Sequence, residues 1–118
     1  MISGLEVVYL YVSDMERSLA FYRDLLGVPL EADANDPNWA EARLDGVRFA
    51  LHLARPGAEP ETRNTVRFDF RVDDIDAEME RLRAAGVECG AVMREPWGSL
   101  CELSDPDGYT VELFAPFA

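Results

Sequence analysis

The stretch Leu10-Tyr11-Val12-Ser13-Asp14-Met15 has a counterpart 60 positions further along the chain, Phe70-Arg71-Val72-Asp73-Asp74-Ile75. In both stretches, alternating apolar residues lead into an acidic residue and then into a helical pattern. This is the signature of a strand followed by a helix, because side chains alternate every two residues in a strand and recur about every 3.6 in a helix. The 118-residue chain therefore predicts one compact domain built from two copies of the same unit.

The first copy predicts a strand with apolar residues at Leu5, Val8, Leu10 and Val12, then a helix. Ser13 and Glu16 have the spacing of a capping box, and Gly27 stands where a left-handed C-cap belongs. The residues expected to face the core from this helix are Met15, Leu19, Tyr22, Leu25 and Leu26. Strands are predicted over 28–30, 39–44 and 47–53, with a hairpin turn at Asp45-Gly46.

The second copy repeats this order, starting from a strand with Val66, Phe68, Phe70 and Val72. Its helix is capped by Asp73 or Asp74, places Ile75, Met79 and Leu82 in the core and ends at Gly86. Strands follow over 87–93, 100–103 and 109–114, with a turn at 105–108. The polar segment 55–64, which contains Pro56, Gly57 and Pro60, predicts a linker between module one (1–54) and module two (65–118).

Composition removes several classes of function. The formal net charge is −12 and all 11 basic residues are arginines, so nucleic-acid and anionic-membrane binding are not expected, and lysine chemistry is excluded. No apolar run reaches the roughly 20 residues of a membrane span, and no signal peptide is apparent, so we expect a cytoplasmic protein with reduced thiols at Cys89 and Cys101. Nucleophile-elbow, phosphate-loop and zinc-protease motifs are missing.

Three stretches together resemble the vicinal oxygen chelate superfamily, the glyoxalase, bleomycin-resistance and extradiol-dioxygenase group. They are the stretch 12–22 with Leu25-Leu26-Gly27, the stretch 72–76 with Ala84-Ala85-Gly86-Val87, and Asp105-Pro106-Asp107-Gly108-Tyr109-Thr110-Val111-Glu112-Leu113. The resemblance implies an α+β fold of two βαβββ modules whose sheets curl around a cavity. It also implies a homodimer with a small-molecule ligand.

In the enzymes of that superfamily a divalent metal is held from four strands, and motif spacing matches those positions to Val7, His52, Arg67 and Glu112. Valine has no lone pair, and a guanidinium cannot lose its proton to coordinate a metal. We therefore expect no cofactor and no metal ligands in the chain, with a weak divalent metal at His52 and Glu112 as the alternative. Arg67 is expected to pair with Glu112 or to bind a ligand oxyanion.

Strand alternation adds the remaining candidates. Val7, Tyr9 and Tyr11 share one face, and so do Arg67, Asp69 and Arg71, while His52 lies opposite the apolar residues of its own strand. The expected ligand-binding residues are Tyr9, Tyr11, His52, Arg67, Asp69, Glu112, Trp39 and Trp97. The two tryptophans are equally compatible with packing at a rim or dimer contact. The acids Glu41, Asp69 and Glu102 favour a cationic ligand.

Two hypotheses of function follow. The first is a metal-free module that sequesters a small amphipathic or cationic compound, as in the bleomycin-resistance branch. The alternative is an enzyme of the superfamily, a lyase, isomerase or dioxygenase, in which His52 and Glu112 are catalytic and Arg67 stabilises an oxyanion. A regulatory or purely interacting role is a third possibility.

Overall fold

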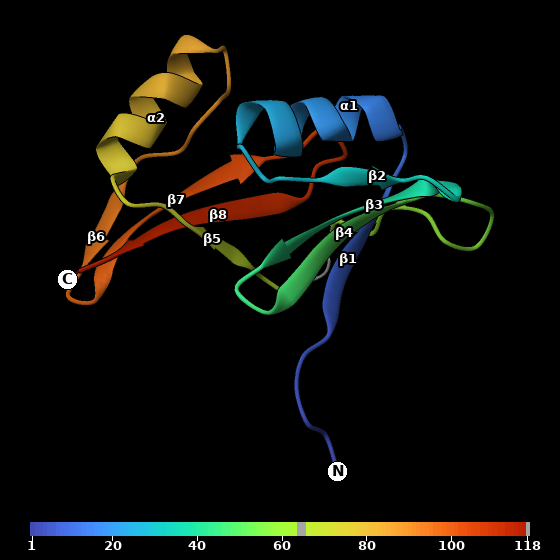
Figure 1. The fold of residues 1–118 in the computed structure, drawn as a ribbon. Helices are drawn as coiled ribbons and strands as arrows, with labels where there is room; N and C mark the ends of the chain where they lie inside the picture. The colour runs from blue at the N-terminus through green and yellow to red at the C-terminus, as the bar shows by residue number, and fades with distance from the viewer. Residues whose placement is uncertain (64–65, 118) are drawn as a thin grey trace. The chain divides into compact units, whose positions relative to one another are not determined.

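The computed structural model describes residues 1–63 and 66–117, and the chain divides into two compact units, Met1–Glu61 and Thr62–Ala118. Each unit has the order strand, helix, strand, strand, strand, and each forms one four-stranded sheet (Figure 1). The predicted α+β class and the βαβββ order are therefore confirmed. Of the linker predicted over 55–64, Asn64 lies outside the described residues, while Arg55 and Ala58 close a short turn through hydrogen bonds of 3.3 and 2.8 Å.

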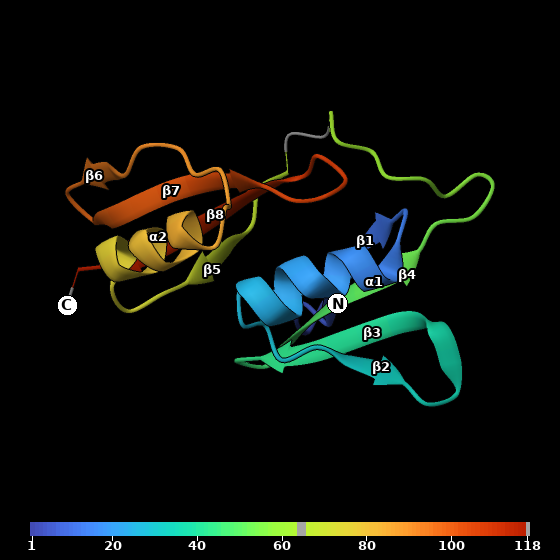
Figure 2. The same ribbon diagram turned by 90° about the horizontal axis from the view of Figure 1, so that it is seen from above.

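Unit 1 has its helix on one face of its sheet (Figure 2). The elements are β1 (Val7–Val12), α1 (Met15–Leu19), its π-helical continuation η1 (Ala20–Leu25), β2 (Glu31–Asp33), β3 (Asp36–Leu44) and β4 (Val47–Leu53). The strand order is β1-β4-β3-β2, and β1 runs parallel to β4. In the core, the ring of Tyr22 lies 5.3 Å from that of Phe49.

The first helix differs from its prediction at both ends. Asp14, not Ser13, is the N-cap, because its carboxylate accepts the backbone N–H of Arg17 at 3.1 Å. Further on, the N–H of Leu26 donates to the carbonyl of Phe21, five residues back, at 2.9 Å. This wider turn buries both Phe21 and Tyr22, whereas Leu25 and Leu26 are only half-buried.

The second strand of unit 1 begins later than predicted. Val28 and Leu30 are buried, but β2 starts only at Glu31. The N–H of Val28 instead donates to the carbonyl of Tyr22 at 2.8 Å, which fixes the end of the helix. The hairpin turn is confirmed: Asp45 and Gly46 both have positive φ, 49° and 84°, as a tight two-residue turn requires.

Unit 2 repeats the arrangement with a shorter first strand. Its elements are β5 (Asp69–Arg71), α2 (Ile75–Ala84), β6 (Met93–Glu95), β7 (Gly98–Ser104) and β8 (Thr110–Pro116), in the sheet order β5-β8-β7-β6. Asp74 is the N-cap, and Ile75, Met79 and Leu82 are buried as predicted. The strand predicted over 87–93 was placed too early, since only its last residue belongs to β6.

In both units the apolar residues of the central strands are buried on one face of the sheet. On β4 of unit 1 these are Phe49 and Leu51, and on β8 of unit 2 they are Val111 and Leu113. The intervening residues of these strands belong to the other face, which carries the polar and aromatic candidates described below. Among the described residues, no helix is both long and apolar enough to cross a membrane.

Candidate functional site

Four ring-bearing side chains meet on one face of the unit 1 sheet. We call Tyr9, Tyr11, Trp39 and His52 the aromatic cluster. Tyr11 and Trp39 pair with His52 from either side in the register of β1, β4 and β3. Their ring centroids lie 5.3 and 5.8 Å from that of His52, and the rings of Tyr9 and Trp39 are 5.4 Å apart. Four of the predicted ligand-binding residues are thus brought together.

A small residue makes this approach possible. Ala50 pairs with Tyr9 on one side and with Glu41 on the other, and it is fully buried although it lies on the same face as the cluster. A longer side chain here would fill the space that the rings of Tyr9 and Trp39 occupy. Tyr9 itself remains 44% exposed, which leaves part of the cluster open to solvent.

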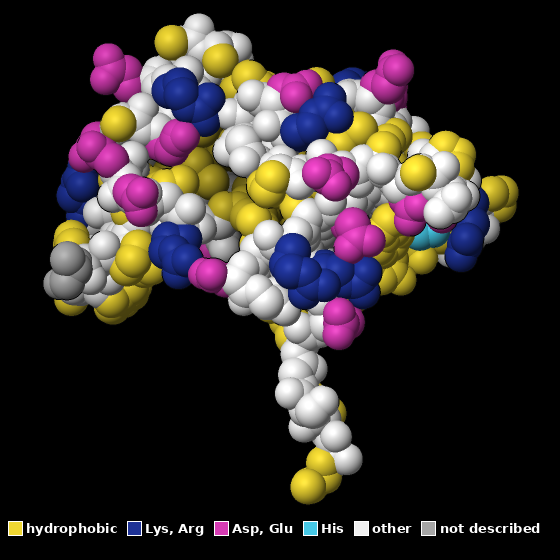
Figure 3. Space-filling model, in the orientation of Figure 1, with side chains coloured by type: hydrophobic (Ala, Val, Ile, Leu, Met, Phe, Trp, Pro, Cys, Tyr) yellow, Lys and Arg dark blue, Asp and Glu magenta, His cyan; other side chains and the backbone are white. Residues whose placement is uncertain are grey.

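The contact of His52 with the backbone defines its tautomer. Its Nδ1 lies 2.8 Å from the carbonyl oxygen of Leu53. A carbonyl only accepts hydrogen bonds, so Nδ1 carries the proton and Nε2 of the neutral ring keeps its lone pair. His52 can therefore accept a hydrogen bond or a proton at Nε2. The single histidine is the cyan side chain beside hydrophobic ones in Figure 3.

Glu41 contacts both a ring of the aromatic cluster and an arginine. Its Oε1 accepts the indole Nε1–H of Trp39 at 3.1 Å, and its Oε2 lies 3.2 Å from Nη1 of Arg48. The hydrogen bond from Trp39, followed by that from Arg48, lowers the pKa of Glu41 below its ordinary value. A carboxylate is thereby kept ionised beside the aromatic cluster.

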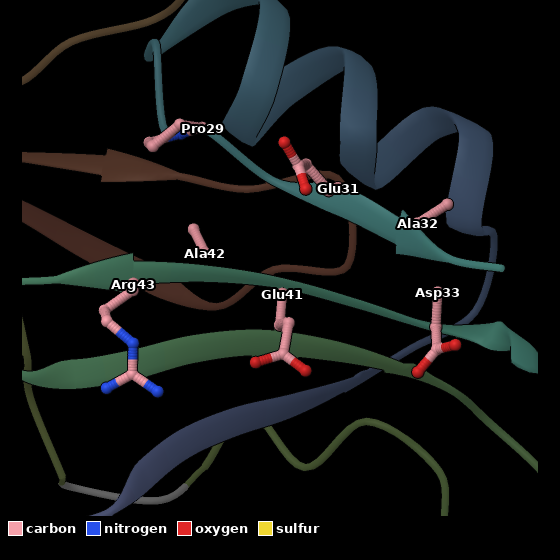
Figure 4. A pocket seen from close by; sticks show the side chains of 7 residues that line it. All are labelled: Pro29, Glu31, Ala32, Asp33, Glu41, Ala42 and Arg43. Carbon is pink, nitrogen blue, oxygen red and sulfur yellow. The ribbon is translucent and has the colours of Figure 1, made fainter. Parts of the chain in front are cut away.

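An open pocket of about 490 Å³ runs along β2 and β3 of the same unit. It is lined by Pro29, Glu31, Ala32, Asp33, Glu41, Ala42 and Arg43 (Figure 4). Three of these residues are acidic and one is basic, so the pocket is negatively charged near neutral pH. Glu41 lines the pocket and also contacts Trp39.

Unit 2 carries three acids in the row that Tyr9, Ala50 and Glu41 form in unit 1. Asp69 pairs with Glu112, and Glu112 pairs with Glu102, so that three acidic residues lie side by side on β5, β8 and β7. We call these three residues the acidic row. A hydrogen bond with Asp69 and burial raise the pKa of Glu112 to about 7. The predicted ion pair with Arg67 is present, with Nε 3.9 Å from Oε1 of Glu112.

Trp97 stands apart from both groups in its role. It occupies the turn between β6 and β7, is 63% exposed, and accepts the backbone N–H of Phe117 through its carbonyl at 3.3 Å. No contact of its indole resembles the one between Trp39 and Glu41 in the described part of the chain. Its proposed part in ligand binding thus rests on exposure alone.

The residues at the superfamily's metal positions do not fit a metal ion. Val7 offers no donor, and the guanidinium of Arg67 already lies 3.9 Å from the carboxylate of Glu112. The register also corrects the match between His52 and Glu112. Tyr9 pairs with Ala50 in unit 1, whereas its counterpart Asp69 pairs with Glu112 in unit 2, so Ala50 rather than His52 corresponds to Glu112. Within the described ranges, no three His, Cys, Asp or Glu residues form a metal-binding group.

One member of the site was missed in the sequence. Arg48 alternates with Ala50 and His52 on β4, which places all three on the face of the aromatic cluster. That alternation was the available signal. The sequence could not predict that Glu41 is the partner of Arg48, because the pairing of Glu41 with Ala50 depends on the hairpin register.

The two βαβββ units define the fold of the vicinal oxygen chelate superfamily, and comparison with known proteins agrees. The chain matches the Glyoxalase/Bleomycin resistance protein/Dioxygenase superfamily over residues 4–113, and it belongs to that superfamily.

Several relatives resemble it over nearly their whole length. The protein YaeR of Escherichia coli (strain K12) is 30% identical, with 94% of this chain and 97% of YaeR covered. The glutathione transferase FosA of Serratia marcescens is also 30% identical, with 96% and 81% covered. Among solved structures, TnmS3, an antibiotic binding protein from Streptomyces sp. CB03234, is 31% identical with a TM-score of 0.76, and 98% of each chain is covered.

Proposed function

We propose that this protein binds and sequesters a small amphipathic or cationic organic compound without the help of a metal ion. The observation that carries the proposal is the aromatic cluster with the ionised Glu41 beside it. Aromatic side chains provide large contact areas with few torsions to immobilise, and a carboxylate next to them favours a positively charged ligand. The similarity to TnmS3, an antibiotic binding protein, supports this class of function.

The chemistry at the metal positions supports the metal-free part of the proposal. In unit 1 the matched position Val7 offers no donor, and in unit 2 a cation beside Glu112 would meet the positive charge of Arg67. Elemental analysis after purification with divalent ions supplied should find well under one metal per chain. One Zn, Ni, Mn or Fe per chain that is lost in both His52→Ala and Glu112→Ala would overturn this part.

Ligand binding is tested with three planar tricyclic probes that differ in charge. Proflavine is a cation, acridine is neutral near pH 7.5 and anthraquinone-2-sulfonate is an anion. Calorimetric titration should give binding in the order cation, neutral, anion, because Glu41 and the pocket along β2 and β3 are negative. Trp39→Ala should weaken binding of proflavine by about tenfold or more, which corresponds to about 1.4 kcal/mol.

The second tryptophan supplies the matched control. Trp97→Phe removes an exposed indole from unit 2 and should leave the affinity for proflavine unchanged. If Trp39→Ala and Trp97→Phe bind all three probes as the wild type does, the aromatic cluster is not the binding site.

A second candidate function is favoured by the state of Glu112. A carboxyl group with a pKa of about 7, next to the guanidinium of Arg67, can exchange a proton with a ligand at neutral pH. Together with His52 as a second candidate group in unit 1, this supports a lyase, isomerase or dioxygenase of the superfamily as the alternative. Hydroxyacetone in deuterium oxide, followed by NMR, tests proton exchange. Deuterium uptake that disappears in Glu112→Gln would favour the enzyme.

A further inference from the structure

Arg48 has a set of contacts that ligand binding alone does not require. Its Nη1 lies 3.2 Å from Glu41, and its Nε lies 3.4 Å from Oε2 of Glu6, which precedes β1. The side chain is only 27% exposed, and Nε is buried without a well-formed hydrogen bond. A guanidinium held this way between two carboxylates costs free energy in desolvation. Its contribution is to the placement of its partners.

The partner that matters for the aromatic cluster is Glu41. One carboxylate oxygen accepts the indole Nε1–H of Trp39 at 3.1 Å, and the other faces Arg48. An indole has a single N–H, so this bond sets how the ring turns about its side-chain torsions. The same ring contacts Tyr9 and His52, at 5.4 and 5.8 Å between centroids. Any rotation of Trp39 therefore changes the whole cluster.

We infer that Glu41, itself held by Arg48, is a positioning residue that fixes the orientation of the Trp39 indole and thereby the shape of the aromatic cluster. The inference rests on the proposed function for its effect on binding, but the positioning itself is measurable without a ligand. Arg48 acts through Glu41: it holds the carboxylate in place with charge, while the carboxylate holds the ring.

The first experiment observes the ring directly in the Trp97→Phe background, where Trp39 is the only tryptophan. The indole N–H resonance of Trp39 and its exchange with solvent are measured by NMR. Glu41→Ala should move the resonance and speed exchange by about tenfold or more, because the N–H loses its acceptor. Glu41→Gln should retain most of the protection, since an amide oxygen still accepts the hydrogen bond.

Arg48 is tested by its dependence on Glu41. Arg48→Ala should perturb the indole resonance when Glu41 is present and should add nothing in the Glu41→Ala background. Asp24→Ala is the matched control, because it breaks another arginine–carboxylate contact of unit 1, at 2.9 Å from Arg23, that touches no tryptophan. If Glu41→Ala leaves the indole N–H as Asp24→Ala does, or if Arg48→Ala acts equally without Glu41, the inference is wrong.

Binding of proflavine separates this inference from the proposed function. Glu41→Gln should bind proflavine less well than the wild type, through lost charge, and Glu41→Ala less well still, through the added loss of ring orientation. The two variants could bind proflavine equally well although only Glu41→Ala releases the indole N–H. That result would show that ring orientation does not govern binding, and it would overturn the inferred effect of Glu41 on binding. If proflavine does not bind the wild type, the choice of ligand fails while the indole measurements still decide the positioning.

Discussion

At the scale of single residues, Glu112 is a carboxyl group whose pKa lies well above its ordinary value. Its neighbours in the sheet register are both acids, Asp69 on β5 and Glu102 on β7. A hydrogen bond with Asp69, burial and the nearby acids favour the protonated form of Glu112, and Arg67 only partly offsets them. We therefore expect the stability of unit 2 to depend on pH in the neutral range.

The first prediction concerns that dependence. The pKa of Glu112 is raised from 4.5 to about 7 in the folded protein, so folding favours the protonated form. The stabilisation is complete below the unfolded-state pKa and is lost as the pH rises through the folded-state value, on the order of 2 kcal/mol in all. Glu112→Gln, which cannot titrate and still hydrogen-bonds Asp69, should be more stable than the wild type at pH 8 and similar at pH 4.

Urea unfolding at several pH values, followed by the fluorescence of Trp97 in a Trp39→Phe background, gives the measurement for unit 2. Glu78→Gln, on helix α2, serves as a control that changes a carboxylate outside the acidic row. A wild-type stability that rises between pH 5 and pH 8 relative to Glu112→Gln would contradict the assignment.

Arg67 gives the second prediction. Its side chain is 46% exposed and its contact with Glu112 spans 3.9 Å, so we expect the ion pair to be as weak as a surface pair. Arg67→Val should cost less than about 1 kcal/mol at pH 5. It should cost more at pH 8, because Arg67 lowers the pKa of Glu112. In the Glu112→Gln background Arg67→Val should cost the same at both pH values. A cost that still differs between pH 5 and pH 8 would mean that another group causes the effect.

The sequence predicted which residues share a face of the sheet better than it predicted which residues pair across strands. Alternation along β1 and β4 correctly placed Tyr9, Tyr11 and His52 on one face. The prediction that His52 and Glu112 occupy equivalent positions in the two units was wrong. It assumed that equivalent residues are always 60 positions apart, but the hairpins that precede β4 and β8 differ in length. Leu44 and Val47 flank two turn residues, whereas Ser104 and Thr110 flank five.

At the scale of elements, apolar runs predicted burial more reliably than strand pairing. The predicted strand over 47–53 coincides with β4, where every second residue faces the core. Val28 and Leu30 are buried too, yet they lie in the connection before β2, since the helix end holds that backbone. The π-helical turn of η1 was also missed, because the expected residues Leu25 and Leu26 assumed α-helical spacing, whereas the wider turn buries Phe21 beside Tyr22.

The third prediction belongs to strand β7. Gly98 begins this strand opposite Pro116, and a Cβ there would lie 2.6 Å from the carbonyl oxygen of Ala115 and 2.9 Å from the ring of Phe114. Gly98→Ala should therefore destabilise unit 2 by about 2 kcal/mol or more, measured by urea unfolding. Gly90→Ala is the control, since its Cβ would meet the carbonyl of Glu102 at 3.5 Å, an ordinary contact. Equal stability of the two variants would contradict the packing at Gly98.

At the scale of the whole molecule, the fourth prediction is a homodimer. Within the described residues each sheet is an open row of four strands, and large apolar side chains such as Ile2, Leu5 and Val66 are exposed. A second copy is the partner we expect to cover this surface. Light scattering at micromolar concentration should give about twice the 13.2 kDa mass of the chain. A value near the mass of one chain would refute the dimer.

The π-helical turn of η1 also bears on the history of the chain. Gly27 follows the capping Asp14 by 13 positions, whereas Gly86 follows Asp74 by only 12. One extra residue is thus accommodated inside the first helix, between two ends that its cap and its glycine hold in place. A duplicated gene whose halves gain or lose residues separately would leave such a record. The two halves can therefore be aligned residue by residue only if a gap is placed within a helix, where alignment methods are least willing to open one.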